Sequence, residues 1–431
     1  MAELGWAQGT ALLVGGVLGP GVLALPHLAA AAAGPASIVA WAALLALSVP
    51  VALTFAALGE RLPGGGGVAA FAGRAFGPRA AAAAGWWFLC AMPVGVLAGA
   101  LIGAEYVVGA LGSTSRGAVV AVAAALLAAA FAANHAGLRF SGRLQLALLG
   151  LLAVLLAAAV VLAIPSVRPA AFTPFAPHGW QGVGRAAGVL FFAFVGWEAA
   201  SHLSGAFGRR TLVRATVLTL AVVTVLYLGL AVTTIGALGP RAATSPVPLT
   251  DLLTLGLGEA ARPVTAVAAL LLSFGAVNTY IAGGARLAAT MFPTEARTND
   301  RRFRPKETRS EGTAFEGATF EGTRFEGTRS DAAGRGLAGL AVVTAVLGAV
   351  VAWAGADLDA LMRATSACLA AVTALGTAAG ARLLTGGRRV AALAATGFTL
   401  LVLAACGPYL VIPAAIGALA LSRRTAAASA R

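Results

Sequence analysis

The sequence predicts an all-α integral membrane protein with twelve transmembrane helices. Of its 431 residues, 59% are hydrophobic and only 11% are charged, and the mean hydropathy is +0.88. A soluble domain needs a much larger polar surface, so lipid must surround most of the chain. The strands of a transmembrane barrel would appear as alternating segments of about ten residues, and the sequence has no such pattern.

Twelve apolar stretches give the helix count. A helix needs about 20 apolar residues to cross the hydrocarbon core. The stretches are 6–33, 36–58, 81–111, 116–134, 144–164, 184–207, 212–238, 261–290, 337–355, 360–381, 389–406 and 408–422. We expect the first five spans to form one unit (6–164), the next five a second unit (184–381), and the last two (389–422) to follow as additional helices.

The net charge of +14 indicates orientation rather than nucleic-acid binding. If the N-terminus is cytoplasmic, 23 of the 30 Lys and Arg residues lie in cytoplasmic segments. Arg286 lies at the inner end of the eighth span, and the external segments carry Arg116, Arg168, Arg185, Arg241, Arg262 and Arg363. The positive-inside rule therefore places both termini in the cytosol. The Ala-, Gly- and Arg-rich composition is typical of a GC-rich bacterial genome, which favours the bacterial plasma membrane.

Residue patterns give no reason to expect an enzyme, a metal site or a cofactor. Cys90, Cys368 and Cys406 are far apart and lie within spans, so they predict neither a disulfide framework nor a metal site. The four histidines do not have the spacing of a zinc site, and no nucleophile elbow or phosphate loop is present. The start of the chain lacks the basic region of a cleaved signal, so we expect the first span to be retained.

Span one contains a predicted helix break. Gly15, Gly16, Gly19 and Gly21 occur within seven residues together with Pro20, which lacks an N–H group. We expect an unwound strip at 16–21. The outer half-helix would then begin with unpaired N–H groups, which suit a carboxylate, and the inner half would end in carbonyls, which suit an ammonium group or a cation. Close helix packing is the alternative explanation for the glycines.

Span six contains a second candidate break. It places Gly196 and the ionisable Glu198 in the middle of an apolar stretch, with His202 four residues later, on the same helix face if the helix continues. Three roles for Glu198 stay open: bonding unwound backbone amides, coupling to protons together with His202, or contacting a substrate ammonium group. His202 could also serve packing alone.

The distance between the two breaks predicts a transporter. A unit of five spans, when repeated, must enter the membrane from the opposite side. Breaks in the first helix of each unit then face each other near the midplane, as in inverted-repeat transporters. A transport-dead sensor or a channel with the same fold is the other reading.

Four motifs in this order resemble the amino acid–polyamine–organocation superfamily. The stretch 15–26 is similar to its first-helix motif, and 191–198 is similar to the phenylalanine–glycine–glutamate pattern of its sixth helix. Residues 59–78 resemble its loop after span two, and 137–145 its loop before span five. The resemblance implies the leucine-transporter-type fold and alternating access for amino acids. It is strongest to bacterial exporters of methionine and branched-chain amino acids, although import or exchange is equally compatible with such a site.

The resemblance also implies where the amino acid binds. Its charged ends would meet the unwound backbone, and the expected binding residues are Gly16, Val17, Leu18, Gly19, Gly21, Phe192, Phe194, Val195, Gly196 and Trp197. Because few charged residues surround these breaks, a neutral, apolar amino acid is the expected substrate.

Coupling must differ from that of many proton-coupled relatives, which carry a lysine in span five. Span five here contains no ionisable residue. The expected coupling or gating residues are Glu198, His202, Glu105, Ser273, Asn278 and Thr279, with a proton or another ion as partner. The three in span eight could line a sodium-like site or bond across helices, and Glu105 could serve packing or coupling.

A polar segment, 293–336, separates spans eight and nine. Residues 311–330 repeat with a period of five and resemble a pentapeptide repeat. Four repeats cannot bury a core of their own, so we expect a plain cytoplasmic loop or a small docking element.

Overall fold

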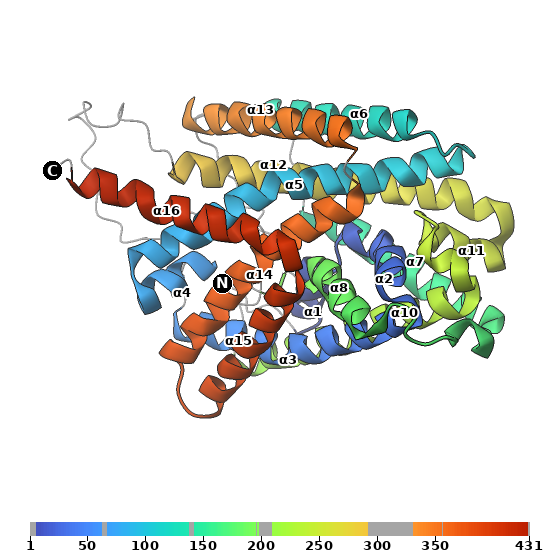
Figure 1. The fold of residues 1–431 in the computed structure, drawn as a ribbon, viewed down its shortest axis with the longest axis horizontal. Helices are drawn as coiled ribbons and strands as arrows, with labels where there is room; N and C mark the ends of the chain where they lie inside the picture. Colours follow the sequence, from blue (N-terminus) through green and yellow to red (C-terminus); the bar gives the residue numbers. More distant parts are fainter. Residues whose placement is uncertain are drawn as a thin grey trace.

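The computed structural model describes residues 6–62, 67–137, 142–194, 196–197, 209–291, 331–355 and 357–429. Val195, Glu198, His202 and the repeat 311–330 lie outside these ranges. Every regular element in the described ranges is a helix, as Figure 1 shows. The prediction of an all-α protein is confirmed for this part of the chain.

The α-helices follow one another with short connections. They are α1 (Trp6–Val17), α2 (Leu25–Ala33), α3 (Ser37–Arg61), α4 (Gly67–Phe76), α5 (Pro78–Ala110), α6 (Arg116–His135), α7 (Gly142–Ala163), α8 (Gly179–Leu190), α10 (Arg209–Leu238), α11 (Pro248–Leu257), α12 (Ala261–Met291), α13 (Asp331–Ala354), α14 (Leu358–Leu383), α15 (Gly387–Ala405) and α16 (Val411–Ser429). The 3₁₀ helices are η1 (Pro20–Leu23), η2 (Gly34–Ala36), η3 (Ile164–Ser166), η4 (Pro169–Phe172), η5 (Phe191–Phe194), η7 (Gly239–Ala243), η8 (Gly258–Ala260) and η10 (Gly407–Leu410).

Nine helical stretches in the described ranges are long and apolar enough to cross a membrane. One of them, Leu25–Arg61, joins α2 and α3. The predicted first and sixth spans fall short because they are in pieces: α1 and α8 each have only 12 residues. The described apolar part of the last span, Gly407–Ala420, is also shorter. A many-helix membrane protein is thus confirmed, whereas the count of twelve stays a prediction.

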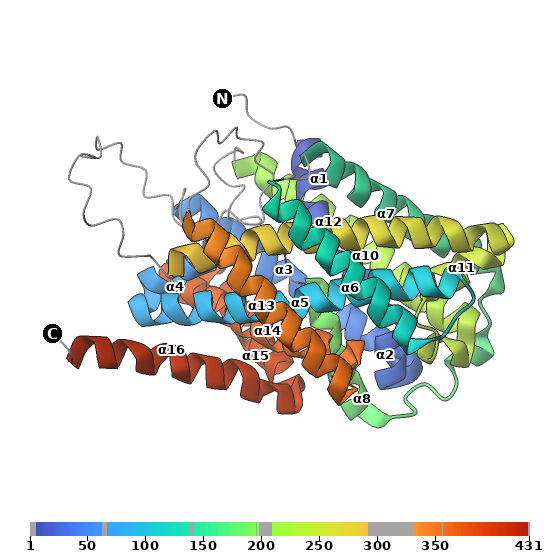
Figure 2. The ribbon, with the colours of Figure 1, turned by 90° about the horizontal axis from the view of Figure 1, so that it is seen from above.

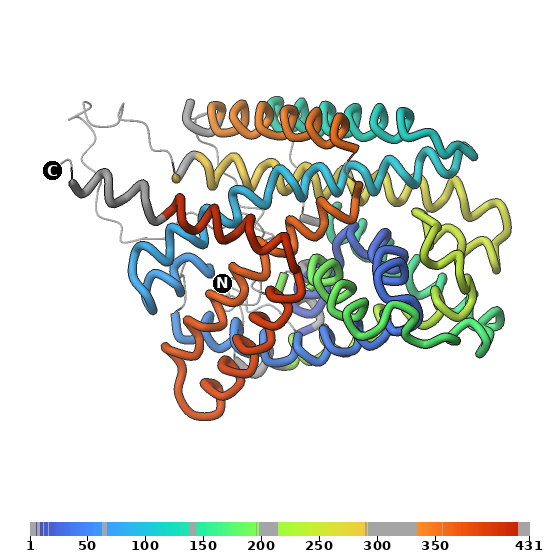
Figure 3. The backbone as a smooth tube through the Cα atoms, viewed as in Figure 1, coloured from blue at the N-terminus to red at the C-terminus, as the bar shows by residue number. Residues whose placement is uncertain are grey.

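The helices form an inner group and an outer group. α6 and α13 lie side by side along one edge, outside α5 and α12, in both ribbon views (Figures 1 and 2). Only 17% and 11% of their apolar windows are buried, against 61% for α5 and 78% for α14. In a bilayer, the exposed apolar faces of α6 and α13 meet lipid. The last helices, α15 and α16, pack outside α14, α3 and α5 (Figure 3).

Two short helices lie outside the predicted spans. α4 packs against α5 and α14, and α11 packs against α7 and α12. α11 buries Leu249, Leu252 and Leu253 and leaves Leu257 exposed. Each has 10 residues, too few to cross the hydrocarbon core, so a search for spans misses both.

Candidate functional site

The helix of span one is broken between α1 and α2. α1 ends at Val17, Leu18 and Gly19 are non-helical, and η1 is followed by a turn at Ala24. The prediction that unwinding begins at Gly16 is therefore wrong by two residues. The helix continues through Gly16 because the Leu18 N–H still donates to the Val14 carbonyl at 2.7 Å. The break begins only where Pro20 supplies no N–H.

Two backbone amides stay unpaired in this break. Gly19 has extended backbone, with φ −108° and ψ 170°. The carbonyls of Gly19 and Gly21 accept hydrogen bonds from Val22 N–H (3.3 Å) and Ala24 N–H (3.1 Å). The N–H groups of Gly19 and Gly21 donate to no residue that the structure describes. Adjacent unpaired N–H groups form a site suited to an anion such as a carboxylate.

The second break lies against the first. α8 ends at Leu190 and continues as η5, and Gly196 then has φ +127°, a conformation that other residues rarely adopt. A Cβ atom added at Gly21 would lie 2.6 Å from Cδ1 of Phe192. The phenyl ring of the sixth span therefore covers the backbone of the first.

A small cavity lies where the breaks meet. Its volume is about 30 Å³, enough for a water molecule or two but not for an amino acid. Its walls come from both breaks and from α5 and α12: Val17, Gly19, Pro20, Gly21, Val22, Gly95, Gly99, Ile102, Phe192, Ala193, Ala276, Val277 and Tyr280. The site is thus contracted, and Phe192 or a wall helix must move before a ligand can enter.

Sequence reasoning missed the α5 and α12 residues of this wall. A signal for α5 was present, because Gly95, Gly99 and Gly103 recur every four residues and so form one smooth helix face. Nothing comparable marks Ala276 and Val277 on α12.

Most of the aromatic residues expected at the site pack behind it. Phe194 is 3% exposed, and its ring lies 6.0 Å from that of Trp41 and 5.8 Å from that of Tyr227. The Tyr227 hydroxyl donates to the Val17 carbonyl at 3.3 Å, which caps α1. Trp197 is 1% exposed and donates through Nε1 to the Ser48 hydroxyl at 3.1 Å. These side chains hold the breaks in place and do not line the cavity.

Leu18, also expected at the site, is fully buried and lies outside the cavity wall. Of the expected aromatic liners in the described ranges, only Phe192 reaches the cavity.

The polar residues of α12 also face away from the cavity. The Asn278 Oδ1 atom accepts a hydrogen bond of 2.6 Å from Asn134 Nδ2 on α6, and the Thr279 hydroxyl donates to the Gly275 carbonyl at 2.9 Å. The Ser273 hydroxyl is buried against Gly103 without a hydrogen-bond partner among the described residues. For Asn278, this geometry favours bonding across helices over a sodium-like site.

Replacing Asn278 should therefore weaken the fold slightly and spare transport. We expect Asn278→Ala to cost about 0.6 kcal/mol, and at most about 1.7 kcal/mol, the range for polar pairs between membrane helices. Asn134→Ala should cost a similar amount because it removes the same bond. Thermal unfolding in detergent and sodium titration of transport check both. A sodium-dependent loss of transport in Asn278→Ala alone would contradict this role.

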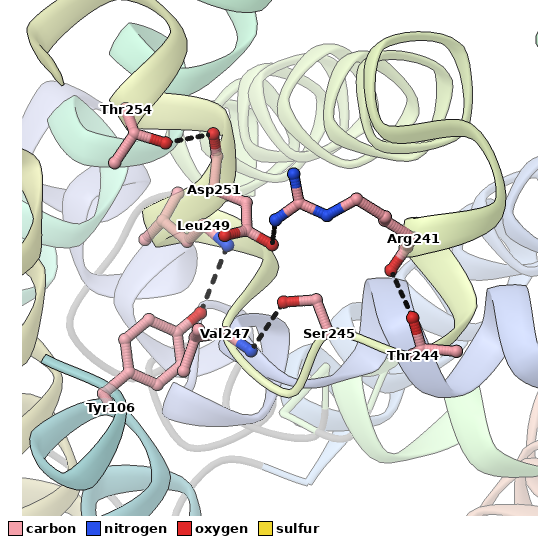
Figure 4. A network of polar contacts seen from close by, with 8 residues as sticks. All are labelled: Tyr106, Arg241, Thr244, Ser245, Val247, Leu249, Asp251 and Thr254. Carbon is pink, nitrogen blue, oxygen red and sulfur yellow. Dashed lines mark hydrogen bonds and ion pairs between the residues drawn. The ribbon is translucent and has the colours of Figure 1, made fainter. Parts of the chain in front are cut away.

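Tyr106 connects the first break to α11 (Figure 4). Its hydroxyl donates to the Leu23 carbonyl at 2.9 Å and accepts from the Leu249 N–H at 3.3 Å. Leu23 ends η1, and Leu249 lies in the first turn of α11. One buried hydroxyl therefore satisfies a carbonyl of the break and an otherwise unpaired amide of α11.

Further polar contacts fix the segment before α11 (Figure 4). Arg241 Nη2 lies 3.4 Å from Asp251 Oδ2, an ion-pair separation rather than a short hydrogen bond. The Ser245 hydroxyl accepts from the Val247 N–H at 3.3 Å. A displacement of α11 must therefore act on Tyr106 and, through it, on the break.

Glu105 lies next to Tyr106 but does not line the small cavity; it belongs to a separate, larger one. In the described part of the chain, no three His, Cys, Asp or Glu residues are grouped as metal ligands. The three cysteines there are free.

Comparison with known proteins identifies the family. The family model of amino acid permeases matches residues 4–420. The chain belongs to the amino acid permease family. The resemblance drawn from the glycine-rich first span and from the sixth span is thereby confirmed. The family is one of transporters, not of enzymes.

Individual permeases are similar over about two thirds of their length. The chain is 34% identical to the uncharacterized amino acid permease YecA of Bacillus subtilis over 65% of the chain and 67% of that protein. It is 35% identical to the L-methionine/branched-chain amino acid exporter YjeH of Escherichia coli, over 66% and 69%. It is 28% identical to the branched-chain amino acid permease BcaP of Bacillus subtilis, over 46% of each chain.

Solved structures share the fold of this permease at low sequence identity. The Eremococcus coleocola manganese transporter, in complex with an aromatic bis-isothiourea substituted compound, has a TM-score of 0.56 and 14% identity. The match covers 97% of this chain and 92% of that one. At this identity, the likeness concerns the fold alone.

Proposed function

We propose that this permease is a secondary active transporter of neutral, apolar amino acids (methionine, leucine, isoleucine and valine) that works by alternating access. The observation that carries the proposal is the pair of unpaired amides at Gly19 and Gly21 in an apolar cavity. The amides suit a carboxylate, and no charged side chain lines the described cavity to meet a charged substrate.

Export is the direction we propose. The support is the similarity to an exporter of methionine and branched-chain amino acids. Import or exchange is the second possibility, and the similarity to a branched-chain amino acid permease supports the same substrate class in either direction.

The proposal includes a topology of twelve spans in the bacterial plasma membrane. The units 6–164 and 184–381 would be inverted repeats that begin at α1 and α8, and 389–422 would add two helices. The excess of Lys and Arg in the predicted cytoplasmic segments supports cytoplasmic termini. The contact of Phe192 with Gly21 supports facing breaks.

A substrate panel on purified protein in liposomes tests this function. Counterflow of labelled methionine should be saturable and competed by leucine, isoleucine and valine, with little competition by arginine or aspartate. The direction follows from the orientation of the protein in the vesicle and from the effect of a pH gradient. Uptake of arginine or aspartate without uptake of methionine or leucine would overturn the proposal. Current without saturation would indicate a channel instead.

Glu198 is the residue that we propose for proton coupling. Glu198→Gln removes its charge and keeps its size, so counterflow should persist while transport driven by a pH gradient is lost. Both rates are measured on the same vesicles. Gradient-driven transport at the wild-type rate would exclude a coupling role for Glu198.

A further inference from the structure

A second, much larger cavity lies beside α5. Its volume is about 1220 Å³, beyond the range of about 300–1,000 Å³ typical of small-molecule sites. Its walls come from α5, α6, α11, α13 and the connections at their ends. It shares no lining residue with the small cavity at the breaks. It is therefore a separate space.

The cavity has the form of a groove along the outer helices. Its α6 wall extends from Arg116 to Phe131, about 22 Å at 1.5 Å per residue. Its α13 wall extends from Ala341 to Ala352. α6 and α13 are the least buried spans and lie side by side at the edge of the molecule. An apolar molecule could therefore enter from the bilayer.

Charged residues gather at one end of the groove, which we call the mouth. It carries three arginines and three acids: Arg116, Arg241, Arg262, Asp251, Glu259 and Asp357. Arg262 Nε lies 2.8 Å from Glu259 Oε2, and Arg241 pairs with Asp251. Asp357 accepts a hydrogen bond of 3.0 Å from the Ala360 N–H. The charges of the mouth therefore balance.

Two polar groups inside the groove have no partner. The Oε2 atom of Glu105 and the Oγ1 atom of Thr344 are both buried, and neither has a hydrogen-bond partner among the described residues. Thr344 is 2% exposed. A buried carboxyl group without a partner is costly and is by default a functional group in a membrane protein. Glu105 is thus the one acid of the groove that no described residue satisfies.

We propose that this groove binds hydrophobic amines, molecules with one ammonium group and an apolar body. The ammonium group pairs with Glu105, assisted by the Thr344 hydroxyl, and the body lies along the Leu, Val and Ala walls. The choice follows from charge. A lipid acyl chain would leave Glu105 unpaired, an anionic amphiphile would be repelled by it, and the balanced mouth favours neither sign.

The test measures binding of ¹⁴C-labelled dodecylamine to the full chain in lipid nanodiscs, with empty nanodiscs as background. We expect saturable binding of one amine per chain. Dodecanol, which has the same chain without the charge, should bind about tenfold more weakly, the effect of one charge-assisted contact. Glu105→Gln should weaken dodecylamine binding by about the same factor and leave dodecanol binding unchanged. Glu60→Gln is the matched control, because Glu60 pairs with Arg388 outside the groove.

A second pair of variants tests the location without touching the acid. Ala124 and Ala125 are neighbours on α6 and both are exposed, but only Ala124 lines the groove. Ala124→Phe should abolish saturable binding, and Ala125→Phe should not. Equal binding by these two variants, equal binding of amine by wild type and Glu105→Gln, or displacement of dodecylamine by methionine would each overturn the proposal.

Discussion

Gly21→Ala is expected to lower the transport rate of this permease by at least about 100-fold. The added Cβ would lie 2.6 Å from both Cδ1 and Cε1 of Phe192, closer than real Cβ contacts come. The ring would have to shift into a cavity of only about 30 Å³, which is the space a substrate must open. Initial rates of methionine counterflow, at equal amounts of protein per vesicle, give the effect.

Two comparisons separate this effect from a general loss of folding. Gly150→Ala is the matched control, because a Cβ at Gly150 on α7 meets no atom within 4 Å. It should leave transport unchanged. Phe192→Leu, combined with Gly21→Ala, removes the ring that is in the way and should restore part of the rate. Wild-type transport by Gly21→Ala would show that the two breaks do not approach each other as described.

Tyr106→Phe is expected to destabilise the protein by about 2–4 kcal/mol and to slow transport about tenfold. The change keeps the ring but leaves the Leu23 carbonyl and the Leu249 N–H without their partner, and a buried unpaired group costs about 1–3 kcal/mol. Because Tyr106 connects α11 to the first break, the loss should also uncouple their movements. Thermal unfolding in detergent and counterflow rates measure the two effects.

Tyr409→Phe provides the control for Tyr106→Phe. Tyr409 is only half-buried and lies in η10, away from both breaks. Its loss of a hydroxyl should change neither stability nor rate by more than a small factor. If the two variants unfold at the same temperature, the hydrogen bonds of Tyr106 do not stabilise the fold.

The membrane spans and both breaks could be predicted because the bilayer imposes strong rules. A span must be long and apolar, and a break must carry residues that tolerate unpaired backbone, such as the Gly–Pro cluster before α2. The short helices α4 and α11 escaped prediction because no such rule applies to 10-residue helices. The start of the first break was misplaced because glycine permits unwinding without requiring it, whereas Pro20 does require a missing hydrogen bond.

The site was predicted less fully than the fold because its walls depend on packing between distant segments. An aromatic residue beside a break can point into the site or away from it. Phe194 points away because Trp41 and Tyr227, from α3 and α10, surround it. The contributions of Gly99 and Val277 likewise depend on α5 and α12 lying side by side, which neither sequence reveals alone.

Binding of a substrate carboxylate at Gly19 and Gly21 is tested most directly by competition with an analogue that lacks this group. Methionine counterflow is measured in the presence of leucine and, separately, of 3-(methylthio)propylamine, which is methionine without its carboxylate. We expect leucine to compete at concentrations similar to methionine. The amine should be about 100-fold weaker, since two hydrogen bonds to a charged group are lost. Competition by the amine at the same concentration as leucine would contradict carboxylate binding at the break.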